Sequence, residues 1–571
     1  MRNLQRWFPL LRHTASYRAH NYAMDVIAGL IIAVVLVPEA IAYSHIAGLP
    51  PEVGLYTAII AYLTYALFGP SRQLVVAPVS IISLMVGVSL GQEGYNPSDY
   101  LAAAVILSLL VAIILFLMGF FKAGCLENLL SKPVQIGFIT AGALIVATTQ
   151  LPHLLGLEIH AVAGPLKTLD TLYQSVRELG GTDWVPLLIG VTGIVSIQLS
   201  KRISPFVPGA LLNLALGVAI LYLVAGLDSG RVEIVGTIPA KLPSFALPWS
   251  MSGESVWQSL ESVHITKLLS IAPAIALVNF VESISIAKVM SARNGDRVEA
   301  NRELMALGAA NFAASFFGAY PAAGSLSKTS VSFQAGARSQ VAGIVAVIAV
   351  MCVLLFLTPY LYYVPKACLA AIVFVAAWHL LEWRNIARAF KLSRSEGWII
   401  VATFVLTLLL GVDYGVLAGI VISFALFIIE TARPEIYRLG KKDGAAHIYA
   451  RENSQGVRID PDELVLKIDA PIFFVNANNI EQQLINILAD NPGVRRVIID
   501  VRGVTNMDLS GEKLFWDLLR TLMLRECDLA LVGITKPVEK LMKASGFYDF
   551  LGPELFFLYI QEAHDHLRGM T

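Results

Sequence analysis

Apolar segments long enough to enter a lipid bilayer recur along the chain from Asp25 to Thr431, and this series limits what the chain can fold into. Charged residues make up only 15% of the sequence, whereas a soluble protein carries about a quarter. The mean hydropathy of +0.67 agrees with this difference. We therefore expect the bilayer to be the solvent for most of the chain. The formal net charge is zero, so nothing in the composition indicates a nucleic-acid partner.

The apolar series divides into fourteen predicted spans. An even number of spans places both termini on one side of the membrane, and Lys and Arg gather in the loops on that side, as at Arg293, Arg297 and Arg302. By the positive-inside rule both termini are then cytoplasmic. The basic stretch 1–22 lacks the apolar core and cleavage site of a secretory signal peptide, so the first apolar run is expected to remain as a span. The compact loops and the absence of a targeting segment favour the inner membrane of a bacterial cell. The predicted spans are residues 25–46, 54–68, 77–90, 100–120, 133–150, 184–199, 208–227, 265–290, 303–318, 325–335, 341–361, 366–382, 397–411 and 414–431.

Two of these segments are too short or too interrupted to cross the membrane as continuous helices. The first passes through a β-branched, extended stretch before Pro78, which suits the first turn of a helix. The second begins at Gly324, offers serine N-caps, and reaches Gly336 after about two helical turns. In both halves nine residues lead from a Phe-Gly pair to the expected helix start. Paired interrupted segments in two halves of a membrane chain indicate an internal repeat and a transporter binding site.

The start of each short helix has the chemistry of an anion site. A helix N-terminus presents unpaired N–H groups and about half a positive charge. Lys328 lies at the start of the second short helix, where it can balance one charge of a bound anion while Ser327 donates a hydrogen bond. The alternative is a lysine that extends to the membrane interface or lies in a loop. We interpret Lys328 as functional, because a lysine inside an apolar bundle needs a partner or a purpose.

Two glutamates fall inside predicted spans. Glu39 and Glu282 should each be protonated, paired or facing water at that depth. A buried carboxylate can carry a proton together with an anion, which is the physical case for symport, with a proton favoured over Na+. Glu282 could instead be a structural partner of Lys288 or Lys328. Tyr43 lies one helical turn after Glu39 and either walls the cavity or packs against a neighbouring span.

The sequence gives no pattern for an enzyme, a metal centre or a cofactor. The four cysteines are scattered without pairing or ligand spacing, and we find no phosphate-binding loop, zinc motif or nucleophile motif. The predicted protein is therefore not an enzyme and needs no cofactor beyond a co-transported proton.

Beyond Arg433 the pattern changes to short strands that alternate with amphipathic helices, which predicts a small α/β domain. We divide the chain into a transmembrane domain (1–432), a charged linker (433–458) and a cytoplasmic domain (459–571). Strands are expected at Leu464–Ile468, Pro471–Val475, Val494–Val501 and Leu529–Ile534, and helices at Asn478–Ala489, Gly511–Leu524, Pro537–Ala544 and Gln561–Leu567.

Three stretches resemble a known family. The segment from Pro38 to Tyr56 is similar to the signature of the SulP sulfate permeases, whose animal members form solute carrier family 26. Phe68–Arg72 and Phe333–Arg338 also resemble conserved stretches of that family, and the C-terminal part resembles its STAS domain. The resemblance implies an α-helical membrane protein of two inverted seven-span repeats, arranged as core and gate domains. It also implies a homodimer and a regulatory partner at the STAS domain.

The resemblance further implies a substrate site between the third and tenth spans. There Pro78, Val79, Ser327, Lys328 and Thr329 would line the site, with Ala77, Ser80 and Leu326 beside them. Tyr43 corresponds to an aromatic residue that closes over the anion, and Glu282 to an acidic residue associated with coupling. This chain departs from many members in having Glu39 in place of glutamine and Lys328 in place of arginine. Ser510 follows a sequence similar to a phosphorylated loop, and is either a phosphorylation site or a helix N-cap.

The sequence is compatible with three functions. The first is a proton-coupled importer of sulfate or a similar small anion, moving its substrate by alternating access. The second is an anion exchanger or a channel-like carrier for chloride, bicarbonate or dicarboxylates on the same scaffold. The third is a membrane sensor that detects an anion and signals through its C-terminal domain. The two titratable glutamates favour the first.

Overall fold

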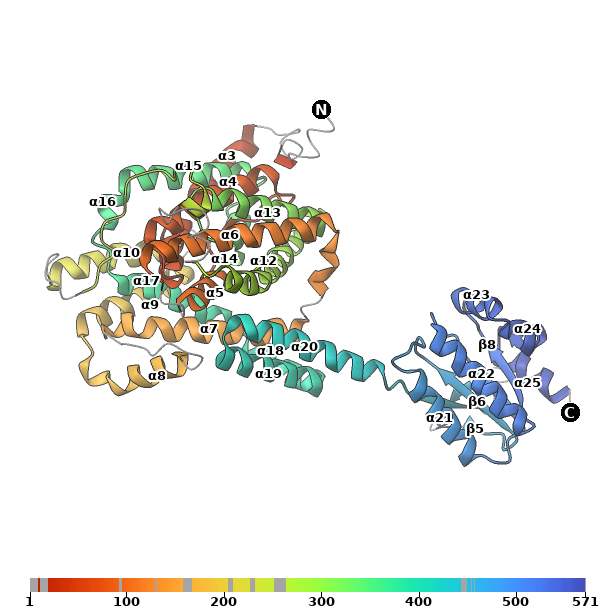
Figure 1. Ribbon diagram of the computed structural model, residues 1–571. Helices are drawn as coiled ribbons and strands as arrows, with labels where there is room; N and C mark the ends of the chain where they lie inside the picture. Colours follow the sequence, from red (N-terminus) through yellow and green to blue (C-terminus); the bar gives the residue numbers. More distant parts are fainter. Residues whose placement is uncertain are drawn as a thin grey trace. The chain divides into compact units, whose positions relative to one another are not determined.

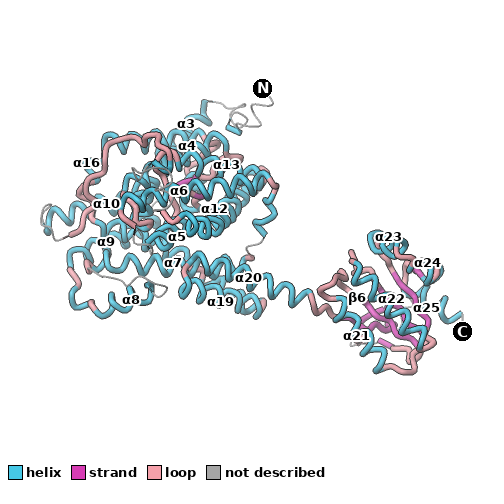
Figure 2. The backbone as a smooth tube through the Cα atoms, in the orientation of Figure 1, coloured by secondary structure: helices cyan, strands magenta, loops and turns pink. Residues whose placement is uncertain are grey.

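The computed structural model describes residues 9–10, 19–91, 95–128, 131–157, 167–203, 209–225, 232–250, 263–442, 449–452, 454–455 and 457–569. The chain divides into two compact units, Met1–Ile422 and Ser423–Thr571 (Figure 1). The first unit is helical, and the longer strands belong to the second (Figure 2).

A helix lies in every segment predicted as a span. Seven helices among the described residues are long and apolar enough to cross a membrane. Two amphipathic helices, α8 (Lys167–Arg177) and α18 (Trp383–Leu392), lie between predicted spans, where no helix is predicted from the sequence. The helices in the predicted spans are α3 (Ala19–Ile46), α4 (Pro51–Phe68), α5 (Ser80–Gly91), α6 (Pro97–Phe120), α7 (Lys132–Leu155), α9 (Trp184–Ile203), α10 (Gly209–Ile220), α12 (Ile265–Asn294), α13 (Ala300–Ser315), α14 (Leu326–Gln334), α15 (Val341–Cys352), α17 (Lys366–Leu380), α19 (Arg394–Leu410) and α20 (Val412–Thr431).

The helices of the first unit pack as two bundles. In the first bundle, α13 packs against α6 and α4, α15 packs against α3 and α4, and α12 packs against α6. In the second, α7 packs against α19, α17 and α9, and α10 packs against α9. The bundles meet where α3 contacts α17 and α10, and where α5 contacts α7. Small residues allow the helices to approach closely, because a Cβ added at Gly54 would lie 2.1 Å from the carbonyl oxygen of Ala40.

Two short strands cross the middle of the first bundle. Strand β1 (Val76–Ala77) pairs antiparallel with β2 (Ala323–Gly324). Each strand is followed directly by a short helix, α5 or α14, as expected for the two interrupted segments. The intervals from the preceding Phe-Gly pairs are unequal, because α5 begins at Ser80 and α14 at Leu326. The equal spacing expected from the sequence is therefore wrong, although the strand–helix pattern of the two segments is the same.

The second unit is a mixed sheet with helices on both faces. The strand order is β4-β3-β6-β7-β8-β9, with β5 paired to β3; β3 is antiparallel to β6, and β6 to β9 are parallel. Helices α21, α22 and α23 share a core with one face, and α25 packs on the other. The elements are β3 (Ile436–Lys442), β4 (Tyr449–Arg451), β5 (Val457–Arg458), β6 (Glu463–Ile468), α21 (Ala477–Asp490), β7 (Arg496–Asp500), α22 (Leu509–Leu524), β8 (Asp528–Val532), α23 (Lys536–Ala544), α24 (Phe547–Leu551), β9 (Phe556–Phe557) and α25 (Ile560–Gly569).

Two expectations for this unit are wrong. Residues 433–458 are not a linker throughout, because they contain β3, β4 and β5, and Leu439 packs into the core under α25. The three basic residues of β3 interrupt the apolar alternation that would have predicted this strand. Pro471–Val475 forms no strand: Ile472 makes a single bridge with Met507, and the chain then turns as the Phe473 N–H donates to the Asn476 side chain.

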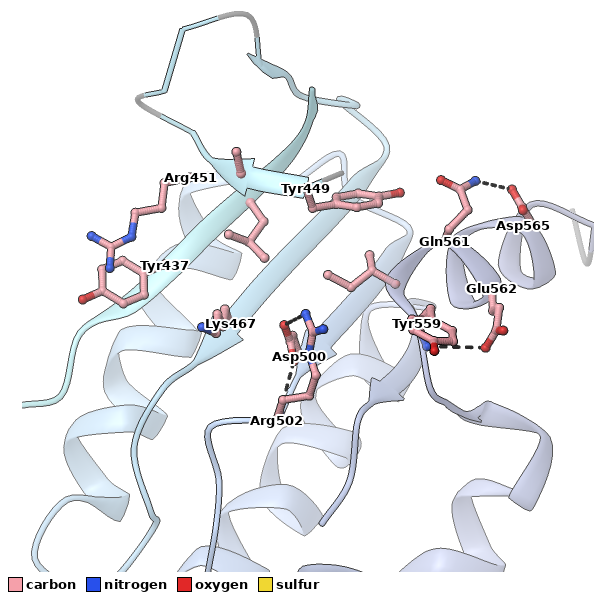
Figure 3. A pocket seen from close by; sticks show the side chains of 13 residues that line it. Tyr437, Tyr449, Arg451, Lys467, Asp500, Arg502, Tyr559, Gln561, Glu562 and Asp565 are labelled. Carbon is pink, nitrogen blue, oxygen red and sulfur yellow. Dashed lines mark hydrogen bonds and ion pairs between the residues drawn. The ribbon is translucent and has the colours of Figure 1, made fainter. Parts of the chain in front are cut away.

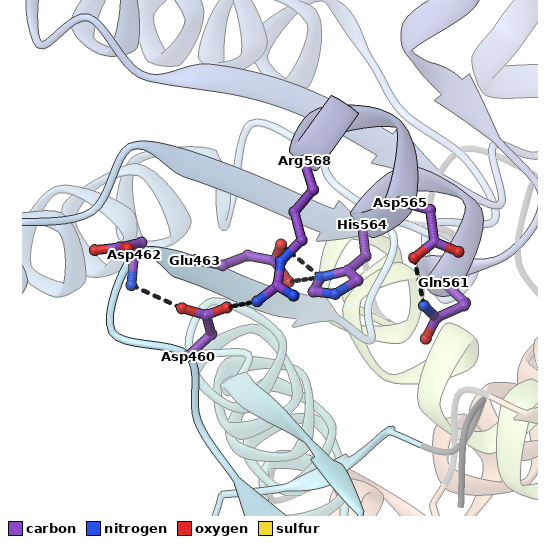
Figure 4. Close-up of polar contacts among 7 residues, drawn as sticks. All are labelled: Asp460, Asp462, Glu463, Gln561, His564, Asp565 and Arg568. Atoms are coloured by element: carbon purple, nitrogen blue, oxygen red, sulfur yellow. Dashed lines mark hydrogen bonds and ion pairs between the residues drawn. The ribbon is translucent and has the colours of Figure 1, made fainter. Parts of the chain in front are cut away.

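Helix α25 is attached to the rest of the unit by two side-chain contacts of different burial (Figure 4). His564 Nδ1 lies 2.7 Å from Glu463 Oε2, with side chains that are 9% and 3% exposed. Arg568 contacts Asp460, but its side chain is 54% exposed. Partial burial raises the pKa of the Asp460 carboxyl, yet the Asp462 amide and the Arg568 guanidinium outweigh it and hold that pKa below its usual value.

Replacing His564 by alanine is expected to destabilise the C-terminal unit by roughly 3 kcal/mol, because it leaves the buried Glu463 carboxylate without its partner. The matched control, Arg568→Ala, should cost less than about 1 kcal/mol, because that pair is largely exposed. Amide hydrogen exchange of β6 and α25 in the full-length protein measures both. Equal protection in the two variants would contradict the assignment of His564 as the main attachment.

Candidate anion-binding site

The N-termini of α5 and α14 meet across the short β1–β2 pair. The Ser325 N–H donates to the carbonyl of Val75 over 2.9 Å, and the Val75 N–H donates to the Thr329 hydroxyl over 3.0 Å. These bonds hold the start of α14 against the strand that leads into α5. The first amides of each helix have no acceptor within their own helix, so both ends present donors and positive partial charge to the same region.

The residues that begin the two helices differ from the sequence expectation in detail. Pro78 does not lie in the first turn, because α5 begins at Ser80 and the Val79 carbonyl accepts the first helical bond. Pro78 instead ends the extended stretch and turns its carbonyl oxygen towards Lys328. Ser325 is the N-cap of α14, but its side chain does not cap the helix. Its hydroxyl contacts the Ser327 hydroxyl and accepts a hydrogen bond from Lys328.

Lys328 is fully buried and is surrounded by partners. Its ammonium lies 2.6 Å from Glu39 Oε2, 3.1 Å from the Pro78 carbonyl oxygen and 3.3 Å from the Ser325 hydroxyl. It also lies 4.8 Å from the centre of the Tyr43 ring. The lysine therefore lies in the bundle as predicted, and its charge is balanced by Glu39. An anion can reach the ammonium only if Glu39 moves or loses its charge.

Helix α3 supplies Glu39 and Tyr43 from one face, one turn apart. The Glu39 side chain is 12% exposed, and Tyr43 is almost completely buried. The Tyr43 ring lies over the ammonium, so a cation–π contact adds to the ion pair. Tyr43 is thus a buried neighbour of Lys328.

Glu282 lies apart from the ion pair on α12. It is partly buried, and its Oε2 atom is buried with no hydrogen-bond partner among the described residues. Neither expected structural pairing occurs: Lys288 binds Glu127 over 2.6 Å, and Lys328 binds Glu39. Glu282 is nevertheless close enough to Lys328 for that charge to act on it. Burial without a hydrogen-bond partner favours the protonated form of this carboxyl group, whereas the Lys328 charge opposes it.

The other predicted site residues are of two kinds: most are buried, and two are exposed. Ala77 is buried in β1, and Val79 and Ser80 are buried at the start of α5. Thr329 is buried and its hydroxyl is used by the Val75 amide, which makes it a support of the site. Leu326 and Ser327 are exposed at the start of α14.

Several polar residues that are not among the predicted site residues support the region around the N-termini of α5 and α14. The Asn279 and Asn311 amides both donate to the Ala322 carbonyl, and the Ser283 hydroxyl accepts from the Gly324 N–H. These contacts fix β2 on α12 and α13. The sequence feature that could have predicted these residues is the presence of asparagine within apolar spans, because an amide side chain there needs hydrogen-bond partners.

In the C-terminal unit, the loop before α22 removes one of the two roles expected for Ser510. Asp508 is the N-cap, because its carboxylate accepts from the amides of Ser510 and Gly511. The suggestion that Ser510 caps the helix is therefore wrong. The adjacent Leu509 side chain is 76% exposed.

A cavity of about 820 Å³ lies in the same unit, between β3, β4 and α25 (Figure 3). Arg451 lies over the Tyr437 ring, and Arg502 is paired with Asp500. Lys467 binds Asp469. Each of these three cations therefore has a partner within the C-terminal unit.

Comparison with known proteins identifies the family. The sulfate permease family model matches residues 22–403, and the STAS domain model matches residues 455–563. Probable sulfate transporter 4.2 of Arabidopsis thaliana is 32% identical over 97% of this chain and 83% of its own length. Putative sulfate transporter YvdB of Bacillus subtilis is 29% identical over 97% of this chain and 98% of its own.

Solved structures are similar in fold. The murine Solute Carrier 26 family member A9 anion transporter in the inward-facing state has a TM-score of 0.89 at 24% identity, over 99% of this chain and 94% of that one. The transmembrane domain of a cyanobacterium bicarbonate transporter has a TM-score of 0.58 at 21% identity, over 72% of this chain and 98% of that one. The resemblance seen in the sequence is confirmed. The chain belongs to the sulfate permease family, a family of multi-pass membrane transporters of anions rather than enzymes, and carries a STAS domain.

Proposed function

We propose that this protein is a secondary active transporter that imports sulfate together with protons by alternating access. The observation that carries the proposal is the buried Lys328–Glu39 pair at the meeting ends of α5 and α14. The printed names of the curated relatives support sulfate as the substrate. The packing of the first unit as two bundles supports alternating access, because the bundles can move relative to each other about the site.

The ion pair suggests how a proton and an anion are coupled. While Glu39 is ionised it occupies the Lys328 ammonium, and a second anion at the same place meets the carboxylate charge. Protonation of Glu39 removes that charge and leaves Lys328, with the helix ends, free for an anion. Glu282, whose Oε2 atom has no hydrogen-bond partner among the described residues, offers a second proton site beside the same cation. Binding of the anion and of the proton therefore favour each other.

The finer architecture is part of this proposal. We infer fourteen spans arranged as two inverted repeats, both termini in the cytoplasm, and a place in the bacterial inner membrane. The strand–helix pattern of β1–α5 and β2–α14, paired antiparallel, supports the repeat. We also propose a homodimer, and regulation through the STAS domain by a partner protein or by phosphorylation of Ser510. A phosphate there would lie beside the Asp508 carboxylate and would loosen the N-terminus of α22 by repulsion.

The test is uptake by purified protein in proteoliposomes of labelled sulfate, bicarbonate and a dicarboxylate, with and without an inward proton gradient. We expect sulfate to accumulate and the gradient to stimulate its uptake. A chloride-dependent flux that does not change with the proton gradient would indicate an anion exchanger instead of a symporter. If none of these anions crosses the membrane, the result would favour the third function, a membrane sensor.

A further inference from the structure

Two large apolar side chains are exposed on neighbouring loops of the C-terminal unit. Phe474 is 75% exposed, and Leu509, the first residue of α22, is 76% exposed. Their loops are joined, because Ile472 bridges Met507 and the Phe474 N–H donates to Asp508 Oδ2 over 2.7 Å. We refer to Phe474 and Leu509 as the apolar pair.

The loop that carries Phe474 is bonded to the end of the last predicted span. Asn476, two residues after Phe474, donates from its side-chain amide to the Thr431 carbonyl over 3.4 Å. Thr431 is the last residue of α20 and follows the apolar part of that helix by two residues. The Gln483 side chain also donates to the Pro434 carbonyl over 2.8 Å, so α21 is fixed to the segment that leaves α20. All these residues belong to the second unit.

The end of α20 places this part of the unit near lipid. In the last turns of α20, Phe427, Ile428 and Ile429 are all at least half-exposed, as expected of a helix whose solvent is the bilayer. The proposed topology brings α20 out of the bilayer on the cytoplasmic side. The headgroup layer there is about 5–8 Å deep. Residues held against Thr431 therefore lie close to the headgroups.

The carboxylate next to the apolar pair is satisfied within the protein. Asp508 accepts three backbone N–H groups, from Phe474, Ser510 and Gly511. Such charge-assisted hydrogen bonds replace much of the water that a free carboxylate would hold. The negative charge of Asp508 is therefore a smaller obstacle to contact with a lipid surface than a carboxylate in water would be.

A cation lies on the same face of α22 as one member of the pair. Lys513 is exposed and follows Leu509 by four residues, which is about one helical turn. The Glu512 carboxylate before it accepts a hydrogen bond from the Trp516 indole over 2.6 Å. Apolar side chains beside a lysine are typical of protein surfaces that lie on anionic headgroups.

We propose that Phe474 and Leu509 insert into the headgroup layer of the cytoplasmic leaflet, with Lys513 against anionic phospholipid, and so hold the STAS domain on the membrane surface. A bilayer is the occupant that the structure favours, because the apolar pair is bonded to the helix whose exposed apolar side chains already face lipid. The inference goes beyond the proposed transport function. Its test measures contact with lipid and not flux, so failure of either leaves the other standing.

The measurement is the quenching of a bimane label by lipids that carry a nitroxide at the headgroup, with the full-length protein in vesicles of phosphatidylethanolamine and phosphatidylglycerol. The native cysteines are first replaced by alanine, and a single cysteine is then introduced as Phe474→Cys, Leu509→Cys or Leu524→Cys. Leu524 is the matched control, because it is 83% exposed at the other end of α22, about 22 Å from Leu509. We expect the nitroxide lipids to quench the labels at the apolar pair at least three times as strongly as the control label.

A label can create an apolar contact of its own, so charge variants test the native side chains. In the labelled Phe474→Cys protein, Leu509→Asp should reduce quenching by the nitroxide lipids at least twofold, whereas Leu524→Asp should leave it unchanged. If Leu509→Asp does not fold, Lys513→Glu takes its place and should also reduce quenching in these vesicles.

Two results would overturn the inference. Equal quenching at the apolar pair and at Leu524, with full quenching of both by iodide in the water, would show that the pair is simply exposed to solvent. Shielding of the label from both iodide and the nitroxide lipids would show that protein covers the pair, such as a second copy of this chain.

Discussion

Replacing Lys328 by alanine is expected to weaken sulfate binding by about 10- to 150-fold and to reduce uptake accordingly. The ammonium supplies a fixed positive charge between the ends of α5 and α14, and a hydrogen bond to a charged group contributes roughly 1.5–3 kcal/mol. Binding of labelled sulfate to detergent-purified protein at acid pH measures the change. Lys288→Ala is the matched control, since that lysine is half-exposed and pairs with Glu127 away from the site.

The alanine variant also leaves Glu39 without its partner, so lost stability could imitate lost binding. The double variant Glu39→Gln/Lys328→Ala removes both charges and should recover folding, seen as a normal elution profile and melting temperature, without recovering sulfate binding. Lys328→Arg should keep binding, because a guanidinium supplies the charge with more donors. Wild-type uptake after Ser327 and Lys328 were both replaced by alanine would exclude the helix-end site.

Replacing Glu39 by glutamine is expected to remove the stimulation of uptake by a proton gradient. The neutral amide resembles the protonated acid, so Lys328 would be available to an anion at every pH. Sulfate affinity at pH 8 should therefore rise, by about tenfold if the carboxylate opposes the anion by roughly 1.4 kcal/mol, while accumulation against a gradient is lost. Uptake with equal and unequal pH across the membrane measures both effects.

Two further variants sharpen the assignment. Glu127→Gln is the control, because this carboxylate binds Lys288 outside the site and should leave coupling intact. Glu282→Gln separates the two acids: if Glu282 alone carries the proton, its variant loses coupling and Glu39→Gln keeps it. Full activity and full gradient dependence in both glutamine variants would remove proton coupling by these acids.

Hydropathy and local pattern are enough to predict much of this protein. Each predicted span contains a helix, and the interrupted segments at Pro78 and Ser327 do become strand–helix pairs. These features depend on neighbours along the chain, such as an apolar run or a serine before a helix. The α/β character of the C-terminal unit follows from the same kind of signal. Strand β3 does not give this signal, because three of its residues are basic, although it lies inside the sheet between β4 and β6.

Which polar side chains meet was decided by the tertiary structure. The sequence placed Glu39, Glu282 and Lys328 inside the membrane. Helix crossing geometry then paired Lys328 with Glu39 and Lys288 with Glu127, and left Glu282 Oε2 without a hydrogen-bond partner among the described residues. It also brought His45 against His153, a contact that no local pattern signals. The sequence by itself determined where the helices form and which end of each short helix attracts anions. Only the packing of two bundles determined which charges lie within a few ångströms of each other, because that distance depends on segments far apart in the chain.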